Sequence, residues 1–259
     1  MLLQEKIAVI TGAGRGIGRA IALAYAREGA HLVLAARDLA ALEETRALAA
    51  EFQREVLVVE LDLRQRESVQ ALAKQTLDHF GQVDILVNNS GIAGPTAPLW
   101  EITPEDWQET LDVDLTGPYL CCHAFLPSML DRRTGTILLI GSMTGKRPLA
   151  GRTPYAAAKL GLVGLVRTLA WEVGPYNLRV NLISPGPVEG ARIERVVREM
   201  ARAQGISTEE ALRLFLRDSP LDRVAPPGDV ANAAVFLASD LSASTTGEDF
   251  NVSSGIAMY

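Results

Sequence analysis

The sequence of 259 residues contains only two cysteines, Cys121 and Cys122, and they are neighbours. A disulfide between adjacent cysteines would be strained, so we expect two free, buried thiols in a reducing compartment. The three histidines are scattered and lack metal-ligand spacing, which argues against a zinc site. The sequence therefore predicts neither a disulfide framework nor a metal site.

Long apolar runs and basic blocks are also missing. No apolar stretch approaches the ~20 residues that cross a bilayer. The first residues, Met1–Lys6, lack the basic segment and apolar stretch of a signal peptide. The net charge is −6, whereas binding to nucleic acid needs a basic face. These absences predict a cytoplasmic protein that binds neither membranes nor nucleic acid.

The chain instead alternates short apolar runs with longer helical ones, and 48% of its residues are hydrophobic. The apolar runs are nearly continuous, as expected of strands buried on both faces of a parallel sheet. They lie at 7–11, 31–36, 56–61, 84–88, 136–141, 179–184 and 249–252. The helical stretches lie at 17–28, 39–52, 68–80, 104–130, 154–173 and 228–238. This order predicts one α/β domain over residues 1–259, a Rossmann fold with a doubly wound parallel sheet and helices on both faces.

One segment interrupts this order, because residues 187–221 contain no strand. Two helical stretches occupy it instead, and Ser207 with Glu210 three residues later forms a capping-box pattern. An insertion beyond the carboxyl ends of the strands is well placed to cover a ligand. We therefore expect a helical substrate lid at about 187–221, with a surface helical hairpin as the alternative.

A glycine-rich turn, Thr11–Gly18, joins the first predicted strand to a helix. Glycine lets the backbone approach a pyrophosphate without a Cβ clash, and the helix offers free N–H groups and the positive end of its dipole. The spacing T-G-x-x-x-G-x-G matches neither the common dinucleotide fingerprint nor the P-loop, which argues against an NTPase. The turn predicts a dinucleotide site, and a purely structural turn is the alternative.

The end of the second predicted strand bears on the choice of cofactor. An acidic side chain there binds a ribose 2′-hydroxyl, whereas a basic one accommodates a 2′-phosphate. Here Ala36 closes the strand and Arg37 follows it, while Arg15 in the glycine turn adds a second positive charge. Asp38 complicates the pattern, but it is expected to cap the next helix. The sequence thus favours NADP over NAD.

A tyrosine and a lysine, Tyr155 and Lys159, stand one helical turn apart on the same face of a predicted helix. A nearby ammonium stabilises a phenolate, which suits a phenol to acid–base catalysis. Ser142 ends the preceding predicted strand, where its hydroxyl can bind a substrate oxygen. The three side chains predict a catalytic group at the cofactor edge of the sheet.

With these features in order, the chain resembles the short-chain dehydrogenase/reductase family, and the 3-oxoacyl-[acyl-carrier-protein] reductases within it. The resemblance runs through nearly the whole length and includes the thirteen-residue step from Ser142 to Tyr155. The matching positions are Thr11–Gly18, Asp62, Asn88–Gly91, Ser142, Tyr155, Lys159 and Pro185–Gly186.

The resemblance implies that Tyr155 protonates the carbonyl oxygen, that Lys159 holds the nicotinamide ribose and that Ser142 orients the substrate. It also implies a set of residues around the cofactor: Gly12, Arg15, Gly16, Ile17, Gly18, Arg37, Asp62, Leu63, Asn89, Gly91, Tyr155, Lys159, Pro185, Gly186 and Val188. In the family the helix with the tyrosine joins a four-helix interface, which implies a homotetramer.

Three positions depart from the family's pattern. Asp114 replaces an asparagine whose backbone carbonyl serves the proton relay to the lysine, so it counts among the catalytic residues with an added negative charge. Gly190 stands where a threonine often contacts the cofactor's carboxamide. Ser253 and Ser254 stand where two glycines are common, in a region that usually supports subunit packing.

The leading hypothesis is an NADP-dependent oxidoreductase that moves a hydride between nicotinamide and a carbonyl or secondary alcohol, with an acyl thioester as a candidate substrate. Mostly apolar positions in the expected pocket, Leu149, Gly151, Pro187 and Val188, favour an apolar ketone. A polyol or sugar dehydrogenase of the same family is the first alternative. A cofactor-binding sensor or scaffold with weak catalysis is the second, motivated by the three departures.

Overall fold

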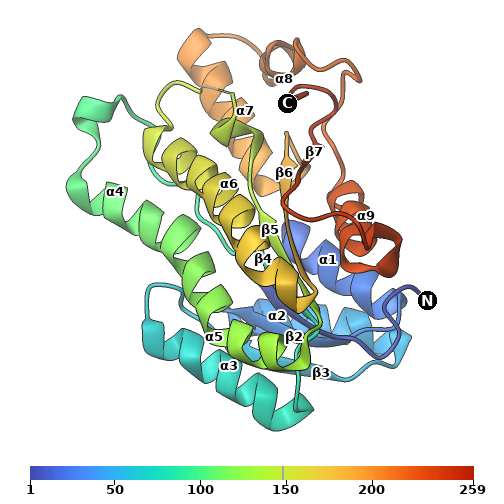
Figure 1. Cartoon of the computed structure of the whole chain (residues 1–259). Coiled ribbons are helices and arrows are strands. Elements are labelled where there is room, and N and C mark those ends of the chain that lie inside the picture. Colours follow the sequence, from blue (N-terminus) through green and yellow to red (C-terminus); the bar gives the residue numbers. More distant parts are fainter. Residues whose placement is uncertain (148) are drawn as a thin grey trace.

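The computed structural model describes residues 1–147 and 149–259, and these form one α/β domain (Figure 1). Within these residues, seven parallel strands form a single sheet in the order β3-β2-β1-β4-β5-β6-β7. Their bounds are β1 Ile7–Thr11, β2 His31–Ala36, β3 Val56–Glu60, β4 Ile85–Asn88, β5 Gly135–Ile140, β6 Leu178–Pro185 and β7 Asp249–Val252. All strands match their predicted positions to within one residue at each end, because their apolar runs are bounded by polar or turn residues.

Strands β1 and β4 lie side by side, although β2 and β3 separate them in sequence. From β1 the strands β2 and β3 extend the sheet to one side, and β4 to β7 extend it to the other. In a doubly wound sheet the loops that leave these two strands diverge to opposite faces and open a crevice between them. The glycine turn follows β1 and the segment Asn89–Gly91 follows β4. The fold therefore brings two of the predicted cofactor segments to the same edge.

Helices cover both faces of the sheet (Figure 1). On one face α1 (Gly16–Arg27), α2 (Leu39–Ala49) and α9 (Pro227–Ala238) contribute to a single buried apolar cluster. On the other, α3 (Arg66–Phe80), α5 (Gly117–Arg132) and α6 (Thr153–Val173) form a second cluster, which includes the buried free thiols of Cys121 and Cys122. Burial raises the pKa of both thiols. None of the helices in the described ranges is both long and apolar enough to span a membrane.

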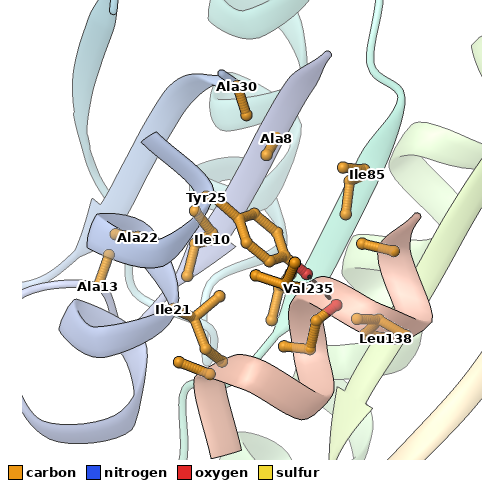
Figure 2. Packing of buried hydrophobic residues seen from close by; sticks show 14 of the residues in the cluster. Ala8, Ile10, Ala13, Ile21, Ala22, Tyr25, Ala30, Ile85, Leu138 and Val235 are labelled. Atoms are coloured by element: carbon orange, nitrogen blue, oxygen red, sulfur yellow. Dashed lines mark hydrogen bonds between the residues drawn. The ribbon is translucent and has the colours of Figure 1, made fainter. Parts of the chain in front are cut away.

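Tyr25 lies at the centre of the first cluster, between α1 and α9 (Figure 2). Its ring is fully buried, and its hydroxyl donates a hydrogen bond of 3.1 Å to the carbonyl oxygen of Ala234. Burial raises the pKa of Tyr25 far above its ordinary value, so the hydroxyl remains a donor. The bond therefore fixes α9 against α1 without leaving a buried polar atom unsatisfied.

The predicted helix at 104–130 differs from the observed one in its middle. Helix α4 (Pro104–Leu111) and helix α5 are separated by a π-helical turn, Asp112–Thr116. This turn holds the fully buried Asp114, whose Oδ1 accepts a 2.8 Å hydrogen bond from the backbone N–H of Ile92. Such wide turns inside helices often occur at functional sites. Here the turn presents Asp114 to the segment that follows β4.

Two helices fill the segment that contains no predicted strand, α7 (Ala191–Gln204) and α8 (Thr208–Leu216). They pack on each other through Val197, Ala201 and Ala211. Ser207 caps α8 as expected, because its side chain accepts a hydrogen bond from the N–H of Glu210. The chain then returns to the end of β7, where the hydroxyl of Ser219 donates to the carbonyl oxygen of Ser254. We call residues 187–221 the helical insertion.

Candidate functional site

The glycine turn is packed too tightly for side chains at Gly12, Gly14 and Gly18. A Cβ on Gly18 would lie 2.2 Å from the carbonyl oxygen of Gly12 and 2.4 Å from the side-chain nitrogen of Asn89. Gly12 has a φ of 69°, which favours glycine. The amide of Asn89 donates to the carbonyl oxygens of Thr11 and Gly12 at 2.9 and 3.2 Å. The predicted residues Gly12, Gly18 and Asn89 thus form one unit that joins the loops after β1 and β4.

The same turn leaves the start of α1 open to an anion. Arg15 is its N-cap residue in an extended conformation, and its side chain makes no capping hydrogen bond. Gly16 has a φ of 54°, and a Cβ there would meet nothing within 4 Å, whereas Ile17 packs against the core below. Uncapped N–H groups at the positive end of a helix suit a phosphate. This cradle fits the pyrophosphate of a dinucleotide.

Arg19, which the sequence argument did not single out, supports the turn from behind. Its guanidinium donates to the carbonyl oxygens of Gly14 and Ala41 and to the hydroxyl of Thr45. Thr45 in turn donates to the carbonyl oxygen of Ala13 at 3.0 Å. These bonds fix the turn to α2, so the cradle is held in place before any ligand arrives.

At the end of β2, Arg37 and Asp38 are both exposed, but they differ in their contacts. Asp38 is the N-cap of α2, as expected from the sequence, and its side chain accepts a 3.1 Å hydrogen bond from the N–H of Ala41. The acidic group at this position is therefore engaged in capping the helix, while the cation faces solvent.

Asp62, which follows β3, forms an ion pair that the sequence argument missed. The guanidinium of Arg64 donates to both of its carboxylate oxygens, with the shorter contact at 2.6 Å. These bonds, helped by the charge of Arg37, hold the pKa of Asp62 below its usual range. The neighbouring Leu63 is buried, and a Cβ on Gly117 at the start of α5 would lie 2.8 Å from its side chain. Asp62 is therefore a fixed anion at this edge.

Ser142, Tyr155 and Lys159 come from two adjacent elements. Ser142 ends the segment after β5 and caps the short 3-10 turn η4 (Met143–Gly145), where its Oγ accepts a 3.1 Å hydrogen bond from the N–H of Thr144. Tyr155 and Lys159 lie in the first turns of α6, and both are largely buried. The ammonium of Lys159 lies 5.6 Å from the centre of the Tyr155 ring and donates to the carbonyl oxygen of Ile140 at 3.0 Å.

The turn η4 rests directly on α6. A Cβ on Gly145 would lie 2.9 Å from the backbone nitrogen of Leu160 and 3.0 Å from the carbonyl carbon of Lys159. Only a glycine permits this approach, because a side chain would meet backbone atoms that cannot move aside. The turn that Ser142 caps is thereby held against the helix that carries Tyr155 and Lys159.

A second cation stands beside Tyr155. Arg152, the N-cap of α6, places its guanidinium carbon 4.9 Å from the centre of the Tyr155 ring. It donates to the carbonyl oxygen of Ala93 at 2.5 Å and to the hydroxyl of Thr96 at 3.3 Å. Its partners are 56 and 59 residues away in the sequence, so no local pattern predicted this role. Arg152 ties the loop after β4 to the start of α6, so it fixes the surroundings of the ring.

Gly91 brings Asp114 and Lys159 to the same place. A Cβ on this glycine would lie 2.9 Å from Oδ1 of Asp114 and 3.4 Å from the ammonium nitrogen of Lys159. The hydrogen bond from Ile92 uses an oxygen that an asparagine side chain would also possess. The aspartate therefore keeps this contact of an amide and places its carboxyl group beside Lys159.

The segment after β6 completes the edge. Pro185 ends the strand, and the N–H of Gly186 donates to the carbonyl oxygen of Val252 at 2.9 Å. A Cβ on Gly186 would lie 2.7 Å from the Cα of Ser253, which requires glycine here. Val188 forms an isolated parallel bridge with Ala225 on the far side of the helical insertion. Pro185, Gly186 and Val188 thus lie at or just after the end of β6, where backbone contacts join the first two to Val252 of β7 and the third to Ala225.

The two serines that replace glycines have local roles. The hydroxyl of Ser253 accepts a 3.1 Å hydrogen bond from the N–H of Ala257, and Ser254 adopts a left-handed φ of 52°. A surface cavity of about 320 Å³ adjoins them, and another of about 280 Å³ lies between α3 and α5. Neither is lined by Ser142, Tyr155 or Lys159. The three predicted catalytic residues thus lie outside both of these cavities.

A family model described as enoyl-(acyl carrier protein) reductase matches residues 12–257. The chain belongs to the short-chain dehydrogenase/reductase family. It is similar to the 3-oxoacyl-[acyl-carrier-protein] reductase FabG of Chlamydia trachomatis, with 34% identity over 257 residues that cover 99% of each chain.

Solved structures of the short-chain dehydrogenase/reductase family agree in fold. An actinorhodin polyketide ketoreductase variant with NADPH superimposes with a TM-score of 0.94 and 32% identity, over 98% of each chain. An NAD⁺-bound xylitol dehydrogenase gives a TM-score of 0.93 at 28% identity, over 98% of this chain and 100% of the other. The protein is therefore an oxidoreductase with a Rossmann-type fold, and a nicotinamide cofactor is supported.

Proposed function

We propose that this short-chain dehydrogenase/reductase is an NADP-dependent carbonyl reductase whose substrates include 3-oxoacyl thioesters. The observation that carries the proposal is the joint placement of Ser142, Tyr155 and Lys159 at the edge where the glycine turn opens. This placement favours turnover over the alternative of a sensor or scaffold, because such a protein needs the cofactor cradle but not three positioned catalytic side chains.

In the proposed mechanism, NADPH supplies a hydride to the carbonyl carbon when it is bound. The hydroxyl of Tyr155 donates a proton to the carbonyl oxygen, and the hydroxyl of Ser142 donates a hydrogen bond to the same oxygen. Lys159 places its positive charge beside the phenol ring, which stabilises the anion that the proton leaves behind. Asp114 and Gly91 border the lysine, and the carbonyl oxygen of Ile140 holds its ammonium group.

The cofactor would be held along the edge of the sheet. The turn Gly12–Gly18 and the open start of α1 suit its pyrophosphate, while Asp62, Leu63, Asn89 and Gly91 suit its adenosine side. Pro185, Gly186 and Val188 suit the nicotinamide. Exposed Arg37 and Arg15, with Asp38 engaged as a helix cap, support a 2′-phosphate and so NADP in preference to NAD.

Replacing Arg37 by alanine is expected to weaken NADPH binding by roughly 10- to 100-fold, which corresponds to the loss of one charged hydrogen bond. NADH has no 2′-phosphate, so its Kd should change less than threefold. Both Kd values come from titrations of cofactor fluorescence. Arg46→Ala on α2, which removes an exposed arginine paired with Glu43, is the matched control. Equal losses for NADPH and NADH would refute the NADP assignment.

The apolar rim beside the site supports the substrate class. Leu99, Trp100 and Leu149 are exposed. The segments that contain these residues are joined by a hydrogen bond from the N–H of Ala97 to the carbonyl oxygen of Gly151. A rim of this kind suits an acyl chain or another apolar ketone better than a polyol. We further propose that the helical insertion acts as the substrate lid.

A panel of substrates assayed with both cofactors tests the proposed function. Acetoacetyl thioesters, bulky cyclic ketones and sugar alcohols represent the competing classes. We expect the highest kcat/KM for an acetoacetyl thioester with NADPH. A clear preference for sugar alcohols would favour the polyol dehydrogenase alternative, and no turnover of any class would favour the sensor alternative.

We propose a cytoplasmic homotetramer as the working form. Support comes from α6, where Trp171 and Leu160 are exposed, with relative exposures of 86% and 54%. Large apolar side chains that face solvent on one helix are typical of subunit contacts.

A further inference from the structure

We propose that Lys146 is a positioning residue for Ser142, and that it acts through a buried ion pair with Asp249. The proposal rests on the proposed function in so far as Ser142 binds the substrate oxygen. Lys146 stands four residues after Ser142, whereas Asp249 begins β7 at the edge of the sheet. Their charged groups are 2.8 Å apart, and both side chains are only 8% exposed.

The ion pair is part of a group of polar contacts between Lys146 and β7. The ammonium of Lys146 also donates to Oδ1 of Asn251 at 2.5 Å, so it binds two residues of β7 at once. Asp249, Asn251 and the rest of β7 pair with β6, which fixes the strand in the sheet. A buried ammonium held by a carboxylate and an amide oxygen cannot rotate away without leaving charge unpaired in the interior.

The network reaches Ser142 through a short path. The N–H of Lys146 donates to the carbonyl oxygen of Met143, and that of Gly145 donates to the carbonyl oxygen of Ser142. Gly145 is pressed against the backbone of α6 on one side, as described above. Lys146 holds the other side to β7. The turn η4 is thus clamped between two elements, and Ser142 caps this turn through its own Oγ.

An ion pair on the surface does not hold its two side chains in one position in this way. Lys74 and Asp78 on α3 are also in contact, but their side chains are 75% and 63% exposed. Such a pair can open into water at little cost. The contrast indicates that the Lys146–Asp249 pair holds the turn η4 in one conformation. This conformation is the one that positions the hydroxyl of Ser142.

The first test measures kinetics in a double-mutant cycle. Lys146→Met should lower kcat about tenfold, the scale of one misplaced hydrogen bond in the transition state, and should change KM and the NADPH Kd less than twofold. In a Ser142→Ala background the same substitution should cause no further loss, because the residue that it positions is already gone. Lys74→Met is the matched control and should leave kcat unchanged. Independent, multiplicative losses in the double variant would overturn the proposal.

The second test needs no substrate. Hydrogen–deuterium exchange should become at least tenfold faster at residues 141–147 in Lys146→Met, and it should stay unchanged there in Lys74→Met. Unchanged exchange in the Lys146 variant would refute the clamp even if the protein turned out to act on no tested substrate. Conversely, faster exchange without catalysis would leave the clamp intact and place the failure in the proposed function.

A third variant guards against misfolding. Lys146→Met with Asp249→Leu replaces the ion pair by an apolar pair and leaves no unpaired charge, so we expect it to fold even where the single variant does not. Its kcat should still be several-fold low, because apolar contacts lack the directional bonds to β7. Wild-type kcat and wild-type exchange in this folded double variant would show that the ion pair has no positioning role.

Discussion

Tyr155→Phe should abolish most turnover while leaving the cofactor site intact. The substitution removes one hydroxyl from a buried ring that has two cations, Lys159 and Arg152, beside it. Proton transfer by a positioned side chain contributes roughly 10²- to 10⁴-fold to a rate, and we expect kcat to fall by about that factor. The NADPH Kd should change less than threefold, since the ring itself remains. Steady-state kinetics and fluorescence titration measure the two quantities.

Tyr176→Phe is the control for this experiment, because it makes the same chemical change at a half-exposed ring that packs against Arg133. We expect it to behave like the wild type in both measurements. If Tyr155→Phe kept more than half of the wild-type kcat on a confirmed substrate, the assignment of the proton donor would be wrong. A loss of cofactor binding in step with kcat would instead indicate a structural role for the hydroxyl.

Gly18→Ala should remove cofactor binding and destabilise the fold. The added methyl group would lie 2.2 Å from the carbonyl oxygen of Gly12, a backbone atom, and 2.4 Å from the amide nitrogen of Asn89. Overpacking of this kind costs roughly 1–3 kcal/mol, and the glycine turn would have to move away from the loop after β4 to relieve it. We expect a lower Tm and a loss of at least 100-fold in affinity, about 2.7 kcal/mol, for both NADPH and NADH.

Gly228→Ala provides the comparison, since it adds the same methyl group at a helical glycine with nothing within 4 Å. Alanine favours a helix over glycine by up to about 1 kcal/mol, so stability should be equal or slightly higher and cofactor affinity unchanged. Wild-type affinity in Gly18→Ala would mean that the turn can relax, and it would refute the preformed cradle.

Much of the fold could be predicted from the sequence because its signals are local. The strands are short apolar runs with clear ends, and the cofactor turn and Tyr155–Lys159 pair depend on spacing within one element. The π-helical turn at Asp112–Thr116 could not be predicted in this way. In this turn Asp114 binds the backbone of Ile92, 22 residues away, and the helical pattern of 104–130 contains no trace of that bond.

The supporting residues of the site were missed for the same reason. Arg152 acts through Ala93 and Thr96, Arg64 through Asp62, and Lys146 through a strand 103 residues later in the sequence. An arginine or lysine in a loop has the same appearance in a sequence whether it faces water or a buried carboxylate. Only the three-dimensional arrangement shows which of them are fixed.

The burial of Cys121 and Cys122 determines when these two thiols can be oxidised. Both cysteines belong to α5, and both are buried in the second core cluster. Burial disfavours the thiolate, which is the form that oxidants attack. Peroxide and electrophiles can reach them only after α5 has separated from the sheet. Oxidation of these cysteines would therefore occur only in molecules that had already unfolded. It would not regulate the activity of the folded enzyme.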